Sequence, residues 1–217
     1  MNPFLIAIAW AVVGAGAGWF VRWGSVKLAR LEGLEPGSKP WQVYGPPLLS
    51  ALLFAIFGYG IPVFPELLLR SVFVLVLVQV IFFDLEHRLI LDRVMFPAIA
   101  VALVVSWFGH PSWAGMATGL GAGLIFLLLA LVGSAIFKTE AMGFGDIKLV
   151  VFIGLLLGWP QTLTGIFYGV VLAGVASIGV IILNRSLRGT IAYGPYLALG
   201  ALIMLFTLPP HVWGGAP

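Results

Sequence analysis

The sequence predicts an all-α membrane protein, a polytopic helical bundle of about eight transmembrane segments with its N-terminus outside. Of its 217 residues, 61% are hydrophobic and only 9% are charged. The mean hydropathy is +1.13. A water-soluble domain needs a more polar surface than this composition provides, so the lipid bilayer is the expected surrounding of the chain.

Eight apolar segments, separated by polar or proline- and glycine-containing turns, are expected to form these helices. They lie at residues 4–23, 46–60, 66–84, 94–109, 116–137, 147–159, 163–183 and 191–206. The first segment has no basic residue before it, and Arg22, Lys27 and Arg30 lie at or beyond its end. It should therefore insert with the N-terminus outside and remain attached, unlike a cleaved signal peptide.

The distribution of basic residues supports this topology. With the N-terminus outside, ten of the eleven Lys and Arg residues lie on the cytoplasmic side, as the positive-inside rule requires. Only Arg70 lies near the outer side, where Glu66 precedes it by four residues and predicts an ion pair on a helix. The net charge of +3 is not gathered in a basic stripe, so nucleic acid is not an expected partner.

Two glycine patterns predict close contacts between helices. One is the run from Gly14 to Gly18, and the other is the repeat of Gly115, Gly119 and Gly123 at every fourth position. Small residues at such a spacing allow helix backbones to approach each other in a membrane.

Asp146 is the first candidate for a catalytic residue. It follows Gly143, Phe144 and Gly145 between two apolar segments. A charged side chain costs about 2.5–3.5 kcal/mol at a bilayer centre and less near the interface, so an acid in this position is a functional candidate. The two glycines would let an extended peptide approach it closely. The alternative is that Asp146 is only the N-cap of the following helix.

Asp84, at the end of the third segment, is the second candidate. The polar turn after it contains Glu86, His87, Arg88 and Asp92. An ion pair with Arg88 on a continued helix is the alternative interpretation. In the predicted topology, however, Asp84 and Asp146 lie at the same membrane face. Two adjacent carboxyl groups do not readily both ionise, so one can keep a proton while the other acts as a base toward water.

Other polar residues near these aspartates are candidates for a supporting or substrate-binding role: Glu140, Glu86, His87, Asp92 and Lys148. A histidine can carry protons at neutral pH, but an aspartate dyad does not require one. The chain has no cysteine and three widely separated histidines. Cysteine chemistry is thus excluded, and no metal site or cofactor is expected.

These motifs resemble those of the type IV prepilin peptidases, membrane aspartyl proteases of the GxGD class. Residues 84–88 with Asp92 are similar to the family's first aspartate segment, and residues 140–149 to its second. Gly158-Trp159 and residues 193–200 also resemble the family, so the similarity covers most of the chain. It implies that Asp84 and Asp146 cleave a type IV prepilin or pseudopilin precursor at the cytoplasmic face of a bacterial inner membrane. Cleavage would separate a short basic leader ending in Gly from a hydrophobic helix.

The sequence also departs from the family pattern. Leu91 stands where a proline commonly occurs, and Pro47 where an acid is expected. Residues 24–44 are expected to be a short cytoplasmic loop, where many family members carry a zinc-binding domain with four cysteines. Residues 1–217 would then be a single membrane-embedded peptidase domain. Because the zinc domain is linked to N-methylation in the family, cleavage with little or no methylation is expected.

Three alternatives remain open at this point. A presenilin-like intramembrane protease shares GxGD, but its first aspartate usually follows Tyr, whereas Phe83 precedes Asp84. A small proton-coupled transporter would usually place its acids near the bilayer midplane between inverted repeats, and no such repeat is evident. A purely structural assembly protein would leave the Gly-Phe-Gly-Asp spacing unexplained.

The predicted topology can be tested by cysteine labelling, because the natural chain has no cysteine. Single cysteines near His87 and Lys138 should react with an impermeant reagent only from the cytoplasm, and one near Pro111 only from outside. Labelling of the first two sites from opposite sides would contradict the placement of both aspartates at one membrane face.

Overall fold

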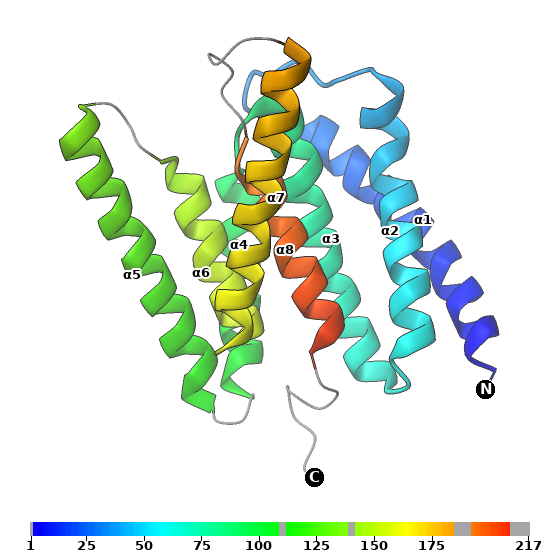
Figure 1. Ribbon diagram of the computed structural model, residues 1–217. Helices are drawn as coiled ribbons and strands as arrows, with labels where there is room; N and C mark the ends of the chain where they lie inside the picture. The colour runs from blue at the N-terminus through cyan, green and yellow to red at the C-terminus, as the bar shows by residue number, and fades with distance from the viewer. Residues whose placement is uncertain (1, 109–111, 139–141, 185–191, 209–217) are drawn as a thin grey trace. The chain divides into compact units, whose positions relative to one another are not determined.

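The computed structural model describes residues 2–108, 112–138, 142–184 and 192–208, and within them it contains eight α-helices and no strand. The helices are α1 (Pro3–Leu31), α2 (Pro40–Gly60), α3 (Phe64–His87), α4 (Asp92–Trp107), α5 (Ser112–Phe137), α6 (Phe144–Leu157), α7 (Gln161–Asn184) and α8 (Gly194–Thr207) (Figure 1). Each corresponds to one predicted segment, so the prediction of an all-α polytopic bundle is confirmed.

Five of these helices are long and apolar enough to cross a membrane. They are α1, α2, α3, α5 and α7. The other three have 16 residues in α4 and 14 each in α6 and α8, which is short of the ~20 residues that a bilayer core requires. For these three helices, and for the orientation of the N-terminus, the predicted topology stays a prediction.

The chain divides into two compact units, Met1–Arg88 and Leu89–Pro217. The first contains α1 to α3 and the second contains α4 to α8. Each is described by itself below. That they form one membrane-embedded domain stays a prediction.

In the first unit, α1 and α2 approach each other at two glycines of the predicted packing run. A Cβ atom on Gly14 would lie 2.6 Å from the carbonyl oxygen of Ser50, and one on Gly18 would lie 2.6 Å from that of Pro46. Gly16, between them, has no atom within 4 Å of such a position. The prediction of a close packing face is therefore confirmed for Gly14 and Gly18, whereas Gly16 faces the other side of the helix.

The connection between α1 and α2 is shorter than the sequence predicted. Residues 24–44 were expected as a loop, but α1 continues to Leu31 and α2 begins at Pro40, which leaves only Glu32–Lys39. The charged residues at the end of α1 do not interrupt it, since one face of this turn buries Ser25 and Ala29. Helix α1 stops where Gly33 takes a positive φ of 71°.

The start of α2 also lies earlier than the predicted Pro46. Both Pro46 and Pro47 lie inside the helix. A proline inside a helix removes one backbone hydrogen bond and usually kinks the helix, but it does not always end it. Pro40 instead occupies the first turn, where its missing N–H has no helical partner to lose.

In the second unit, α5 and α6 run side by side (Figure 1) and meet through the predicted glycine repeat. A Cβ atom on Gly119 would lie 2.7 Å from Cγ and 2.9 Å from the backbone nitrogen of Leu155. Gly154 of α6 faces Gly119 in turn, because a Cβ atom on Gly154 would lie only 2.5 Å from the Gly119 Cα. The predicted small-residue contact is therefore confirmed, and α6 is its partner.

This contact can be tested with two matched substitutions on α5. Gly119→Ala should destabilise the protein by about 1–3 kcal/mol, as overpacking of a tight contact does. Gly121→Ala is the control, because no atom lies within 4 Å of its Cβ position. It should be neutral or stabilise by up to ~1 kcal/mol through helix propensity. Unfolding in detergent measures both variants, and equal effects would contradict the packing role of Gly119.

Candidate functional site

The glycine-flanked aspartate lies at the N-terminal end of α6. Gly143 is the N-cap, with an extended backbone at φ −69° and ψ 140°, and Phe144 is the first helical residue. Asp146 is the third, and its backbone N–H donates to the Gly143 carbonyl at 3.1 Å. The alternative in which Asp146 is itself the N-cap is therefore wrong. An acid in the first turn still gains from the helix dipole.

The carboxyl group of Asp146 turns back toward the N-cap. A Cβ atom on Gly143 would lie 3.6 Å from its Oδ2, in ordinary van der Waals contact. Asp146 precedes the apolar run that starts at Ile147, and burial raises the pKa of its carboxyl from the ordinary 3.8 to about 6. Desolvation disfavours the charged form, so this carboxyl exchanges its proton near neutral pH.

Gly145 is in contact with the loop that precedes α4. A Cβ atom on Gly145 would lie 2.8 Å from the Cβ of Ile90. The second glycine of the motif therefore allows this loop to reach the first turn of α6. Residues 89–91 directly follow the predicted first aspartate segment, so the second unit brings the continuation of that segment against the Gly-Phe-Gly-Asp motif.

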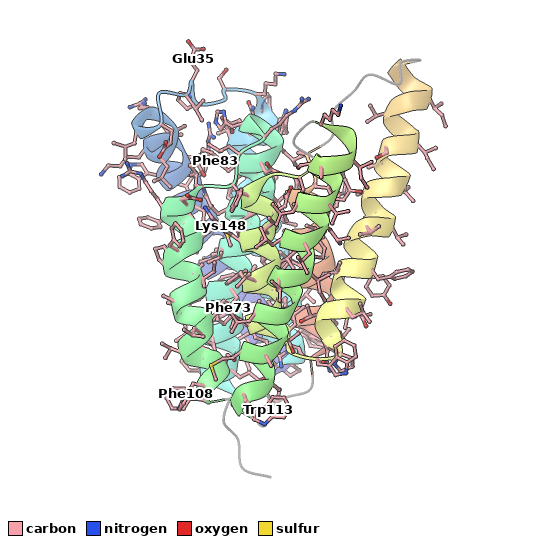
Figure 2. All side chains as sticks on the ribbon, turned by 90° about the vertical axis from the view of Figure 1, so that its left-hand side faces the viewer. Glu35, Phe73, Phe83, Phe108, Trp113 and Lys148 are labelled. Atoms are coloured by element: carbon pink, nitrogen blue, oxygen red, sulfur yellow. The ribbon has the colours of Figure 1, made fainter. Side chains whose placement is uncertain are left out.

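An ion pair joins the same two elements. Lys148 Nζ lies 2.5 Å from Asp92 Oδ1, and the Lys148 ammonium also lies 4.8 Å from the centre of the Phe96 ring. Lys148 of α6, labelled in Figure 2, thus contacts two residues of α4. The Asp92 side chain is 56% exposed, and an exposed pair contributes about 0–1 kcal/mol. The structure gives both predicted supporting residues a role in joining α4 to α6.

Asp84 lies in the last turn of α3 and is buried, with 5% of its surface exposed. Its carbonyl accepts the backbone N–H of Arg88 at 2.8 Å, and Arg88 has left-handed angles of φ 53° and ψ 40°. Helix α3 therefore ends at His87, with Arg88 as its C-cap. The alternative interpretation placed Arg88 on a continued helix, and its ion pair between Asp84 and Arg88 stays a prediction. Asp84 belongs to the first unit and Asp146 to the second, so their pairing stays a prediction.

Glu86 and His87 lie beside Asp84 in the first unit. Glu86 accepts a hydrogen bond from the backbone N–H of Gly37 and pairs with Arg22 at 3.3 Å. His87 Nε2 lies 3.2 Å from Glu86 Oε1, and its ring centre is 4.7 Å from that of Phe83. Both side chains thus make their contacts with other residues of the first unit. Glu140, the remaining supporting candidate, lies outside the described residues.

The sequence prediction missed the partners of Glu86. Arg22 was used there only as one of the basic residues that set the topology, although it lies inside the predicted first transmembrane segment. An arginine in an apolar segment is costly unless it has a partner, and that was the available signal. Gly37 offered no such signal, because it contacts Glu86 through its backbone. Among the described residues, no group of three His, Asp or Glu side chains is placed to hold a metal ion.

Comparison with known proteins finds a family and several relatives. Residues 71–178 match the family model described as the type IV leader peptidase family, and this range includes both candidate aspartates. The prepilin leader peptidase/N-methyltransferase of Bacillus subtilis (strain 168) is 30% identical over 161 residues, covering 72% of this chain and 62% of the relative. The protein of the same name from Aeromonas salmonicida (strain A449) is 29% identical over 170 residues, covering 77% of this chain and 56% of the relative.

A third relative with this name, from Stutzerimonas stutzeri, is 27% identical over 138 residues, covering 60% of this chain and 44% of the relative. The chain therefore spans about half the length of these curated relatives. No solved structure matches the chain.

Proposed function

Since the chain belongs to the type IV leader peptidase family, we propose that it is a membrane aspartic endopeptidase. Its substrate is a type IV prepilin or pseudopilin precursor, and it removes the basic leader at the cytoplasmic face of a bacterial inner membrane. The observation that carries this proposal is Asp146, which lies in a Gly-Phe-Gly-Asp motif and has a pKa raised to about 6 by burial. Such a pKa suits a group that must exchange protons at physiological pH.

In the proposed mechanism, Asp84 and Asp146 share one proton and hold a water molecule against the scissile carbonyl. The ionised carboxylate takes a proton from the water molecule while the water oxygen attacks the carbonyl carbon. At the same time the protonated carboxyl donates its proton to the carbonyl oxygen. Collapse of the tetrahedral intermediate breaks the C–N bond, and a proton passes to the leaving nitrogen. Asp84 is proposed as the partner because it also lies in the matched range and is a buried acid at a helix end.

The first turn of α6 also supports the proposed approach of the substrate. Gly143 is extended and exposed, and Phe144 is 70% exposed. An extended precursor segment can therefore lie along the Gly143 backbone, where no side chain intervenes, with Phe144 beside its apolar residues. In this proposal the substrate's hydrophobic helix remains in the lipid bilayer, and no nucleic acid takes part.

Substitution of the two aspartates tests the dyad. Asp84→Asn and Asp146→Asn keep the side-chain size and most hydrogen bonding but remove the acid, so each should abolish cleavage and leave a folded protein that binds precursor. The assay is precursor cleavage by purified, monodisperse variants.

Glu140→Gln is the comparison variant for the dyad, because a supporting acid is not required for the chemistry. It should at most weaken turnover. If instead either Asn variant turned over at a near-normal rate, the acid would be structural and the aspartic protease assignment would be wrong.

The pH dependence of cleavage follows from the raised pKa of Asp146. Below a pH of about 6 Asp146 is protonated, and above it the shared proton is lost. The cleavage rate should therefore fall on the alkaline side at or above this pH, and on the acid side when the second carboxyl is protonated. The two limbs belong to the pair and not to either residue alone. A flat profile from about pH 4 to 9, measured by kcat/KM, would contradict a shared proton.

The raised pKa of Asp146 also predicts how the stability of the folded protein depends on pH. Because the folded-state pKa is raised above 3.8, the folded protein binds the proton more tightly than the unfolded chain does. The stabilisation is fully present below about pH 4 and is lost as pH rises through about 6. Asp146→Asn should therefore be more stable than the natural protein at about pH 8 and show less difference at about pH 4, which thermal unfolding in detergent can measure.

The short connection between α1 and α2 leads to a prediction about methylation. Glu32–Lys39 contains no cysteine, so we expect cleavage without zinc and little or no N-methylation of the product. Mass spectrometry of the mature pilin N-terminus after co-expression measures this. A stoichiometric gain of one methyl group that depends on this protein would show that the membrane helices alone carry transferase activity.

A further inference from the structure

A closed ring of three hydrogen bonds joins α1, the loop Glu32–Lys39 and the end of α3. The guanidinium of Arg22 donates through Nη1 to Glu86 Oε2 at 3.3 Å and through Nη2 to the carbonyl of Gly37. The backbone N–H of Gly37 donates to the other oxygen of Glu86, Oε1. Both polar backbone groups of Gly37 and both oxygens of Glu86 are thereby engaged.

The ring is largely removed from solvent. The side chains of Arg22 and Glu86 are 10% and 6% exposed. Two charges at this depth are tolerated when they pair and when hydrogen bonds satisfy their remaining atoms, and removing one partner leaves a buried, uncompensated charge. The planar fork of arginine can reach a carboxylate and a carbonyl at once. The ring therefore holds the three segments in one arrangement.

Neighbouring contacts restrict the same loop and the same helix pair. Gly37 packs so closely on the side chain of Gln42 that it has no room for a Cβ atom, and the Gln42 Oε1 accepts the backbone N–H of Lys39 at 2.9 Å. The hydroxyl of Ser25 donates to Gln79 Oε1 at 2.7 Å, which joins α1 to α3 a second time. The loop is thus held at Gly37 and at its Lys39 end, and α1 is held to α3 at Ser25 as well as at Arg22.

We propose that Glu86 is a positioning residue for the cleavage reaction, an inference that rests on the proposed function. It lies two positions after Asp84, in the final residues of α3 before the helix ends at His87. By binding Arg22 and Gly37, Glu86 fixes the end of the helix that carries Asp84 and holds the short loop against it. This role differs from binding the basic leader directly, because the two Glu86 oxygens already have partners.

A double-mutant cycle distinguishes positioning from leader binding. Glu86→Gln and Arg22→Gln should each lower kcat for precursor cleavage about tenfold, with KM changed less than about twofold. The double variant should be no slower than the slower single one, because both substitutions open the same ring. Measurements are made well below the unfolding temperature of every variant.

Glu35→Gln is the matched control, since it removes a carboxylate from the same loop where the side chain is exposed and points away from the helices (Figure 2). It should leave both constants unchanged. A rise in KM for Glu86→Gln without a fall in kcat would assign Glu86 to leader binding. Losses that multiply in the double variant would show that Arg22 and Glu86 act independently. Either result would overturn the proposal.

A second measurement does not depend on cleavage. Ser38 is exposed and the chain has no cysteine, so a nitroxide on Ser38→Cys reports on this loop alone. The label should be restricted in the otherwise natural protein and become mobile with Arg22→Gln or Glu86→Gln. Equal mobility in all three would disprove the ring's role. A restricted label that these substitutions release, in a protein that cleaves no precursor, would instead place the error in the proposed function.

Discussion

The cost of placing charge in apolar surroundings is the constraint on which this structure depends. In a chain with 9% charged residues, the buried charges that the structure describes include two ion pairs. Arg70 pairs with Glu66 one helical turn earlier, and Arg22 pairs with Glu86 across two helices. Such pairs contribute little net stability compared with apolar residues, but opening one is costly. The Arg22–Glu86 pair therefore specifies which faces of α1 and α3 must meet.

The same constraint gives Asp146 its chemical interest. Asp92 is more than half exposed and has the ammonium of Lys148 beside it, so its charge is both solvated and paired. Asp146 is desolvated by burial, which disfavours the charged form and raises its pKa to about 6. Two acids near the same turn of α6 are thus assigned different roles by their surroundings: Asp92 joins helices, and Asp146 can exchange a proton.

Much of the fold could be predicted from the sequence because hydropathy and helix-packing glycines are local signals. Apolar runs predicted all eight helices, and the repeats at Gly14–Gly18 and Gly115–Gly123 predicted two real contacts. Helix ends were less predictable. The polar end of α1 resembles a loop in its composition. The helix nevertheless continues through it, because its charged residues Lys27 and Arg30 lie on the exposed face.

The candidate site was predictable to a similar degree. The Gly-Phe-Gly-Asp spacing identified the motif, but only the backbone shows that Gly143 is the N-cap and that Asp146 lies within the first turn. The contact of Gly145 with Ile90 and the ring at Glu86 join residues that are far apart in the sequence. No local pattern encodes such pairs, and in Gly37 the interacting groups belong to the backbone, which every sequence shares.

Through these contacts, the acids near the proposed site join different pairs of elements. Asp92, through Lys148, and Ile90, through Gly145, hold the start of α4 against the first turn of α6. Glu86, through Arg22 and Gly37, holds the end of α3 against α1 and its loop. In the chain, the contacts of Glu86 thus hold the segment before residues 88–91, and the contacts of Ile90 and Asp92 hold the segment at and after them. A reaction that needs two carboxyl groups placed to within a fraction of an ångström gains most from such rigid support, since small displacements of catalytic groups cost large factors in rate.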